Sequence, residues 1–308
     1  MLISIIIPCY NSEHMIGNVV ELVRSEFGSE ELTGYECEFI LVNDCSSDGT
    51  YDAIVQLTRK YPEVKGISLM RNFGQHNALM CGLNYASGDY CIGMDDDLQT
   101  HPSQLPKIIR KMEEGYYIVY GVYKKSTNKA AKRLTSRLNK ITSGILLGRP
   151  KSIQSSNFWM ITKSVRDQVI LYKNYNPYVD GIFFRCSHNI GNVEIDHHIR
   201  AEGESGYTLK KLLSLWMAYW NFSVVPLRAA SVIGGITSAA GFIAAVVIVI
   251  HKLMDPTTTI GWSSLVCILL IFFGLVLLVL GIIGEYIGDI VLSINSTPQY
   301  IIRDKVNL

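Results

Sequence analysis

The first 122 residues alternate short apolar runs with amphipathic stretches. This alternation is typical of βαβ units, which build a parallel sheet. We therefore expect an α/β domain in the N-terminal part of the chain. Its expected strands are Leu2–Pro8, Glu36–Asn43, Lys65–Met70, Tyr90–Met94 and Tyr117–Val122. Its expected helices are Glu13–Glu26, Thr50–Lys60, Gln75–Ala86 and Ser103–Glu114.

Two long uncharged runs stand in the C-terminal part, at about residues 229–250 and 262–284. At a rise of ~1.5 Å per residue, each can cross a hydrocarbon core of about 30 Å as a helix. The alternative is a buried core hairpin, although uncharged runs of this length are rare in soluble domains. Most Lys and Arg precede the first run and others follow the second, so the positive-inside rule places both termini in the cytoplasm.

The pattern divides the chain into four regions. We expect residues 1–206 to form a cytoplasmic domain. Within it, segment 124–150 is basic and amphipathic, so it can either lie on an anionic membrane surface or form a soluble helix whose basic face is solvated. Residues 207–228 form an interfacial helix, 229–287 hold the two spans, and 288–308 form a cytoplasmic tail.

Composition limits the function classes. The formal net charge is only +1, which argues against a protein that binds nucleic acid in bulk. The seven cysteines are scattered without a CxxC pair, as expected of core residues in a reducing compartment.

Three polar loops follow strands of the expected sheet. Asp95, Asp96 and Asp97 come directly after the fourth strand, and Pro8–Glu13 and Asn43–Thr50 follow the first and second. The carboxyl ends of parallel strands share one edge, so these loops should converge on the crevice where open α/β folds bind ligands. Carboxylates gathered there suit Mg²⁺ or Mn²⁺ bridging phosphates, whereas an isolated acidic run would be a solvated loop.

A series of short motifs runs through nearly the whole chain. The first four are Ser4–Asn11, Asn43–Thr50, Arg71–Leu79 and Asp95–Gln99, and their order resembles that of family 2 glycosyltransferases with the GT-A fold. Gly203–Tyr207, the two uncharged runs and Gly284–Gly288 narrow the resemblance to the polyprenyl-phosphate glycosyltransferases. That group includes bactoprenol glucosyltransferases and dolichyl-phosphate mannose synthases.

The resemblance implies a sugar-nucleotide donor, a UDP- or GDP-sugar. Asp44 would accept a hydrogen bond from the base, and Asp96 would face the nucleotide or the sugar. The residues expected to bind the donor nucleotide are Pro8, Tyr10, Glu13, Asp44 and Asp96. Asp95 and Asp97 would bind the metal ion, Mg²⁺ or Mn²⁺, with Gln99 near the metal and the diphosphate. The residues expected to act in catalysis are Asp95, Asp97, Gln99 and Arg200.

The same resemblance implies a polyprenyl phosphate acceptor, for which undecaprenyl phosphate is expected. The residues expected to bind its phosphate are Lys132, Arg133, Ser136, Arg200 and Ser205. A phosphate monoester has a second pKa of about 6 and is largely dianionic at neutral pH. The acceptor can therefore act as its own nucleophile.

The sequence departs from the family pattern at three positions. Asn157 replaces an acid, Trp159 replaces an Arg, and Tyr123 stands where an Arg is common. These changes motivate one alternative function, a catalytically silent membrane scaffold, although the preserved Asp95 and Asp97 favour an enzyme. The other alternative is a processive polysaccharide synthase, but such enzymes usually carry a Gln-x-x-Arg-Trp element, which this sequence lacks.

We therefore predict a GT-A (Rossmann-like), mainly parallel sheet domain, followed by interfacial amphipathic helices and a two-helix transmembrane hairpin in the plasma membrane. The predicted activity is inverting sugar transfer to a polyprenyl phosphate at the cytoplasmic face, for cell-surface glycan assembly or modification. The resemblance also implies a homo-oligomer in contact with membrane lipids. Two spans are too few to enclose a path for a lipid-linked sugar, so we expect a separate flippase and a downstream glycosyltransferase.

Overall fold

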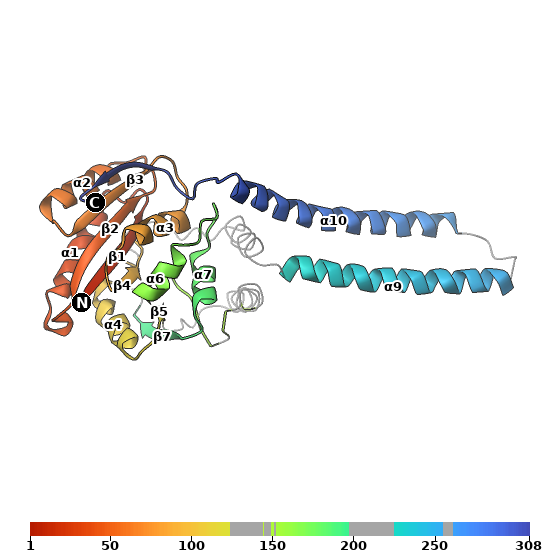
Figure 1. The fold of residues 1–308 in the computed structure, drawn as a ribbon, viewed down its shortest axis with the longest axis horizontal. Helices are drawn as coiled ribbons and strands as arrows, with labels where there is room; N and C mark the ends of the chain where they lie inside the picture. Colours follow the sequence, from red (N-terminus) through yellow and green to blue (C-terminus); the bar gives the residue numbers. More distant parts are fainter. Residues whose placement is uncertain (124–143, 145–148, 151, 197–224, 255–260) are drawn as a thin grey trace. The chain divides into compact units, whose positions relative to one another are not determined.

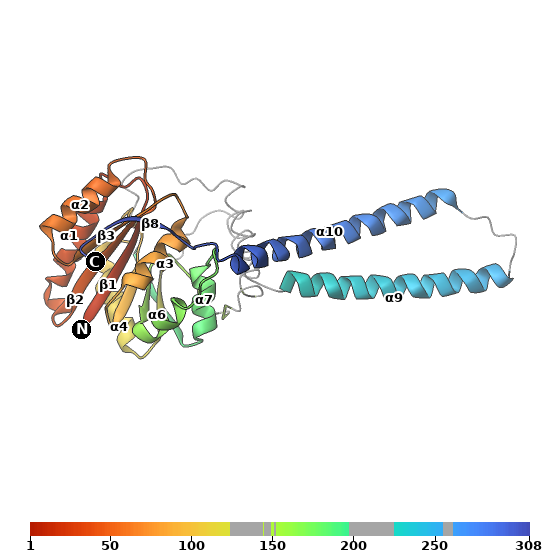
Figure 2. The ribbon, with the colours of Figure 1, turned by 45° about the horizontal axis from the view of Figure 1, so that its top comes forward.

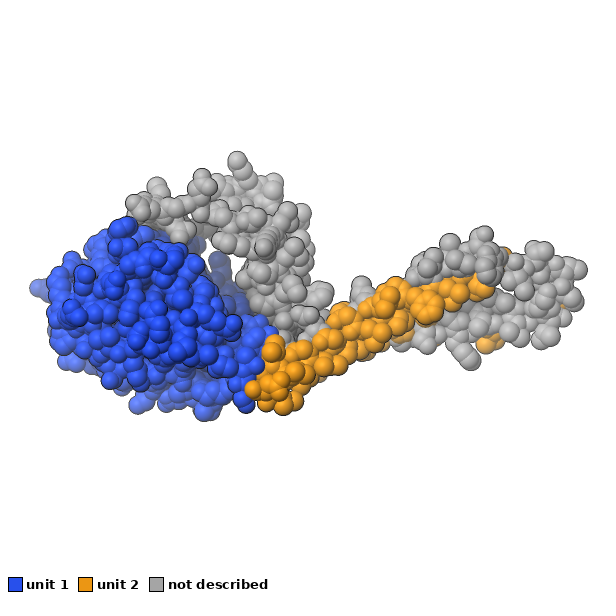
Figure 3. Space-filling view, turned by 90° about the horizontal axis from the view of Figure 1, so that it is seen from above, with its two compact units in different colours: residues 1–209, 296–308 blue, residues 210–295 orange. Residues whose placement is uncertain are grey.

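The computed structural model describes residues 1–123, 144, 149–150, 152–196, 225–254 and 261–308. The chain divides into two compact units, which Figure 3 distinguishes by colour. Unit 1 comprises residues 1–209 and 296–308, and unit 2 comprises residues 210–295.

Unit 1 is built on an eight-stranded sheet with the order β7-β5-β6-β4-β1-β2-β3-β8. Its strands are β1 (Leu2–Cys9), β2 (Glu36–Asn43), β3 (Val64–Leu69), β4 (Tyr90–Gly93), β5 (Ile118–Tyr123), β6 (Trp159–Thr162), β7 (Ile190–Ile195) and β8 (Ile302–Val306). The helices are α1 (Ile16–Phe27), α2 (Thr50–Lys60), α3 (Gln75–Tyr85), α4 (Leu105–Glu113), α6 (Lys163–Val169) and α7 (Val179–Cys186), which can be followed in Figure 1. The α/β alternation predicted from the sequence is thus confirmed, and β2 and α2 have the predicted bounds.

The sheet is mixed. Strand β1 pairs in parallel with β2 and β4, β2 with β3, and β5 with β7. Strand β6 is antiparallel to both β4 and β5, and β8 is antiparallel to β3. The five strands expected from residues 1–122 therefore all run in the same direction, as predicted, but β6, which the sequence did not indicate, lies antiparallel between β4 and β5. A four-residue strand such as β6 is too short to give a periodic signal of its own.

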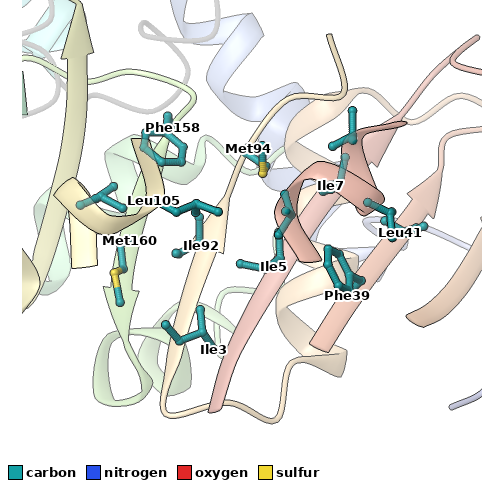
Figure 4. Packing of buried hydrophobic residues seen from close by; sticks show 14 of the residues in the cluster. Ile3, Ile5, Ile7, Phe39, Leu41, Ile92, Met94, Leu105, Phe158 and Met160 are labelled. Atoms are coloured by element: carbon teal, nitrogen blue, oxygen red, sulfur yellow. The ribbon is translucent and has the colours of Figure 1, made fainter. Parts of the chain in front are cut away.

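Alternate residues of the central strands form the main core. Ile3, Ile5 and Ile7 of β1 point to the same face as Phe39 and Leu41 of β2, and all are buried (Figure 4). Further buried residues from α1 and α4 complete this core. On the opposite face α3 packs closely on the sheet, because a Cβ at Gly82 would overlap the side chain of Ile6.

The last residues of the chain complete the sheet at its β3 edge. Figure 2 shows β8 beside β3, and the Met70 amide donates to the Ile301 carbonyl over 2.9 Å. Gln299 is buried, and its Nε2 donates to two backbone carbonyls in the loop before α7, over 2.8 and 2.7 Å. The pairing of β8 covers backbone groups of β3 that would otherwise be unpaired, and Gln299 anchors the segment that leads to it.

Unit 2 contains two long helices, α9 (Val225–Met254) and α10 (Trp262–Ile294), which contact each other. The expected span 229–250 lies within α9, and 262–284 lies within α10. Within the described part of the chain, one helical segment is long and apolar enough to cross a membrane by length and composition. It is Phe272–Ile294, with a mean hydropathy of 2.2 and an exposed surface.

Candidate active site

Three loops with unusual backbone geometry follow β1, β2 and β4, which are adjacent strands of the sheet. Each contains a residue other than glycine in the left-handed region: Asn11 and Cys45 with φ of 55° and Leu98 with φ of 56°. Such conformations are uncommon outside glycine and cluster at functional sites. The predicted convergence of the three loops at one edge therefore coincides with local backbone strain.

Asp95 lies directly beyond β4 and accepts hydrogen bonds from two side-chain amides. Gln75 Nε2, at the start of α3, donates to Asp95 Oδ1 over 2.7 Å. Asn157 Nδ2, in the loop before β6, donates to Asp95 Oδ2 over 2.8 Å. Burial raises the pKa of Asp95 to about 6; the charges of Asp97 and Asp96 act in the same direction and the two amides oppose them.

Asp96 joins the loop after β1 to the loop after β4. Its Oδ2 accepts a hydrogen bond from the Ser12 hydroxyl and a longer one, 3.4 Å, from the Tyr10 amide. Ser12 N in turn donates to Thr50 Oγ1 over 2.7 Å, which brings in the loop after β2. Burial raises the pKa of Asp96, while the hydrogen bonds from Ser12 and Tyr10 lower it.

Asp97 stabilises the turn that its own loop makes after β4. Its Oδ1 accepts a hydrogen bond from the Gln99 amide over 3.1 Å, so these two predicted site residues are adjacent in space. The Tyr123 hydroxyl lies 2.6 Å from Thr100 Oγ1. Burial is the main cause of the raised pKa of Tyr123, and the charges of Asp95 and Asp97 contribute.

The donor set fits a hard divalent cation. Asp95 and Asp97 supply carboxylate oxygens, and a cation would relieve the charge crowding that helps to raise the pKa of Asp95. Among the described residues, no group of three or more His, Cys, Asp or Glu forms a metal site by itself. Mg²⁺ and Mn²⁺ commonly bind through one or two carboxylates, with phosphate and water as the other ligands. The metal-binding role of Asp95 and Asp97 remains a prediction.

Asp44 organises the loop that leads into α3. Its carboxylate is 4% exposed and accepts hydrogen bonds from the Phe73 amide (2.7 Å) and the Gly74 amide (2.8 Å). Burial raises the pKa of Asp44, and these two hydrogen bonds lower it. Its contact with a nucleotide base remains a prediction.

The other donor-binding candidates lie near these loops. Glu13 Oε2 accepts a hydrogen bond from the Gly49 amide over 3.0 Å. A Cβ at Gly49 would stand only 2.6 Å from Glu13 Oε1, so glycine is needed for this contact. Pro8 lies near the end of β1, and Tyr10 is 53% exposed, which leaves its ring available for stacking.

The expected acceptor site lies outside the described residues. This applies to its five residues, Lys132, Arg133, Ser136, Arg200 and Ser205, to nearly all of the basic segment, and to the expected interfacial helix as far as residue 224. Their roles remain predictions.

Sequence reasoning missed both amide partners of Asp95. Gln75 stands inside the motif Arg71–Leu79, and Asn157 stands where the family pattern has an acid, so the motifs mark the two positions but not their contact. Trp159, the other replacement, is a core residue: it is 2% exposed, and its ring centroid lies 4.9 Å from that of Phe183. A Cβ at Gly93 would overlap this ring, so β4 needs glycine there.

Comparison with known proteins identifies the family. Residues 4–170 match the family described as glycosyl transferase family 2, which is more than half of the chain. The chain belongs to glycosyl transferase family 2. It is 34% identical over 304 residues to the uncharacterised glycosyltransferase YkcC of Bacillus subtilis (strain 168), covering 97% of this chain and 93% of that protein. The predicted enzyme class, a glycosyltransferase, is thereby confirmed.

A second relative is named for its substrates. The chain is 30% identical over 315 residues to the undecaprenyl-phosphate 4-deoxy-4-formamido-L-arabinose transferase of Shewanella sediminis (strain HAW-EB3), covering 98% of this chain and 92% of that protein. Both relatives confirm that the chain belongs to a glycosyltransferase family, as its motifs indicated.

Solved structures with a similar fold include glucosyl-3-phosphoglycerate synthase of Mycobacterium tuberculosis. Its complex with phosphoglyceric acid has a TM-score of 0.52 and 18% identity, covering 73% of this chain and 79% of that one. Its complex with Mn²⁺, UDP-glucose and phosphoglyceric acid has a TM-score of 0.51 and 17% identity, with the same coverage. This similarity confirms the Rossmann-like GT-A sheet.

Proposed function

We propose that this glycosyltransferase moves one sugar from a nucleoside diphosphate sugar to a polyprenyl phosphate, with inversion, at the cytoplasmic face of the plasma membrane. The observation that carries the proposal is the joining of three strand-end loops around Asp95, Asp96 and Asp97. The near full-length similarity to a transferase named for undecaprenyl phosphate supports the choice of acceptor.

The donor would lie across the three loops. The exposed Tyr10 ring can stack on the nucleoside, and Asp44 and Glu13 fix the loops on either side of it. Asp95 and Asp97 would hold Mg²⁺ or Mn²⁺ beside the diphosphate, and the ion would offset the negative charge that develops on that leaving group. Gln99 is held next to Asp97 by the turn.

The transfer needs no protein base. An oxygen of the dianionic acceptor phosphate forms the bond to the anomeric carbon on the face opposite the diphosphate. The bond from that carbon to the diphosphate breaks, and its electron pair leaves with the nucleoside diphosphate. No proton changes place, which agrees with an amide rather than an acid at Asn157. Arg200 with Lys132, Arg133, Ser136 and Ser205 would hold the acceptor phosphate, so that catalysis consists of positioning and charge stabilisation.

The proposed location is a membrane site reached by the lipid acceptor. We propose two spans, within α9 and α10, with residues 1–206 and 288–308 in the cytoplasm, supported by the uncharged run in each helix. The basic segment 124–150 and the helix 207–228 would contact membrane lipids. We further propose a homo-oligomer that supplies its product to a separate flippase and a downstream glycosyltransferase.

A donor screen tests the proposal. Full-length protein in detergent is incubated with undecaprenyl phosphate, Mg²⁺ or Mn²⁺, and UDP- and GDP-sugars one at a time, and glycolipid is followed by mass spectrometry. We expect one donor class to give a singly glycosylated lipid that is absent with EDTA. A folded preparation that gives no glycolipid with any donor would contradict the proposal, and a polymeric glycan would indicate a processive synthase instead.

A further inference from the structure

The hydrogen bond between Asn157 and Asp95 fixes the direction of the Asn157 amide. An ionised carboxylate only accepts hydrogen bonds, so the NH₂ group of the amide must face Asp95 Oδ2, 2.8 Å away. The opposite assignment would bring two acceptor oxygens together. The carbonyl Oδ1 of Asn157 therefore points away from Asp95.

The backbone on either side of Asn157 is anchored. The Ser156 hydroxyl donates to the Gly121 carbonyl over 2.6 Å and lies 2.9 Å from the Phe158 carbonyl oxygen. Phe158 is buried in the main core. The Asn157 side chain itself is exposed, and its Oδ1 accepts no hydrogen bond from any residue that the structure describes. A rigid loop thus presents one amide oxygen beside the first carboxylate of the site.

The chemistry of an amide oxygen selects its partner. Oδ1 is an acceptor: it takes a hydrogen-bond donor or binds a hard cation, and titration with Mn²⁺ alone separates the second case from the first. The ionised diphosphate of a donor and the dianionic phosphate of an acceptor offer no group that donates a hydrogen bond. The hydroxyl and amide groups of a sugar do, and the sugar is bonded to the diphosphate that Asp95 would face.

We propose that Asn157 binds the sugar of the donor, accepting a hydrogen bond at Oδ1 from a sugar hydroxyl or N–H group while its Nδ2 remains on Asp95. Asn157 is then a residue that selects the sugar. The inference rests on the proposed function only in requiring a sugar nucleotide beside Asp95. It needs no particular acceptor.

Gln75 offers a matched comparison. Its Nε2 donates to the other oxygen of the same carboxylate, Asp95 Oδ1, over 2.7 Å, but it approaches from the start of α3. Replacing Gln75 with Ala removes one amide from Asp95 and leaves Asn157 in place. Asn189→Ala is a control far from the candidate site. Asn189 is exposed, and its Nδ2 donates to the Gly115 carbonyl where β5 and β7 begin, at the opposite end of the strands from the site.

The experiment measures binding without an acceptor lipid. Full-length wild type, Asn157→Ala, Gln75→Ala and Asn189→Ala are titrated in detergent with Mn²⁺ alone, and then with UDP-glucose, UDP, GDP-mannose and GDP in the presence of Mn²⁺. Isothermal titration calorimetry gives each affinity. We expect wild type to bind one sugar nucleotide more tightly than its diphosphate.

Asn157→Ala also removes one amide from Asp95, so it should weaken Mn²⁺ and the diphosphate about as much as Gln75→Ala does. Beyond that shared loss, its affinity for the sugar nucleotide should fall by about a further tenfold, the ordinary cost of leaving a polar substrate group unpaired. Gln75→Ala should lower the affinities for the sugar nucleotide and for the diphosphate by the same factor. Asn189→Ala should change neither affinity.

Four results would overturn the inference. The first is a wild type that binds sugar nucleotide and diphosphate equally well, and the second is an Asn157→Ala variant that binds all ligands as wild type does. The third is an Asn157→Ala variant in which binding of Mn²⁺ or the diphosphate weakens as much as binding of the sugar nucleotide, which would assign Asn157 to the metal. The fourth is a Gln75→Ala variant with the same sugar-specific loss, which would assign the effect to Asp95. A wild type that binds a sugar nucleotide in this way but forms no glycolipid would instead contradict the proposed function alone.

Discussion

The raised pKa of Asp95 predicts that metal binding by this protein weakens steeply in mildly acidic solution. A divalent ion binds the ionised carboxylate, so a proton on Asp95 competes with it. With a pKa of about 6, Asp95 is about nine-tenths ionised at pH 7 and about one-tenth ionised at pH 5. The apparent affinity for Mn²⁺ should therefore fall about tenfold between these two values, or about 1.4 kcal/mol.

The size of this change distinguishes a carboxylate with a raised pKa from one with an ordinary pKa. An aspartate at the reference value of 3.8 is almost fully ionised at both pH values, so its metal affinity would change by less than about a tenth. The assay is a titration of full-length protein with Mn²⁺, followed by electron paramagnetic resonance of free Mn²⁺, at pH 5 and pH 7. Far-UV circular dichroism at both values controls for folding. Equal affinities at the two pH values, in folded protein, would refute the assignment of Asp95 as a metal ligand with a raised pKa.

Further predictions concern stability and turnover. Metal-free protein should lose stability as the pH rises from about 4 to about 6, because the folded pKa of Asp95 is raised above 3.8; thermal unfolding with EDTA at pH 4 and pH 7 measures this. Asp97→Asn should abolish glycolipid formation while the melting temperature stays near that of wild type; retained turnover would contradict its metal role. Gly93→Ala should cost about 1–3 kcal/mol of unfolding free energy through overlap with the Trp159 ring, measured by urea denaturation; an unchanged midpoint would contradict the packing described here. Gln299→Ala should cost about 1–3 kcal/mol by removing the two hydrogen bonds that this buried amide donates, and a melting curve as in wild type would show that the C-terminal segment is not held there.

The N-terminal half of the fold could be read from local signals. Strands β1 to β4 are apolar runs that end in turn-forming residues, and a helix follows each of them, so local pattern defines them well. Strand β6 has only four residues, and β8 carries three charged residues in five, so neither shows an apolar pattern. Both are strands because they pair with distant neighbours, β4 and β5 or β3, which local sequence does not specify.

The candidate site likewise combines residues that local sequence places with residues that only the tertiary structure places. Asp95, Asp96 and Asp97 could be placed at a sheet edge because strand ends are local features. The amides of Gln75 and Asn157 come from segments 20 and 62 residues away from Asp95, and only tertiary structure brings them to its two oxygens. Trp159 looked like a changed site residue, whereas packing against Gly93 and Phe183 makes it part of the core.

The products of one reaction test the central proposal most directly. Full-length protein is given undecaprenyl phosphate, a divalent ion and the donor that the screen selects, and lipid and nucleotide products are quantified together by mass spectrometry. We expect a lipid monophosphate carrying a single sugar, with one nucleoside diphosphate released for each lipid modified. A lipid diphosphate sugar, release of nucleoside monophosphate, or release of nucleoside diphosphate without a sugar on the lipid would contradict it.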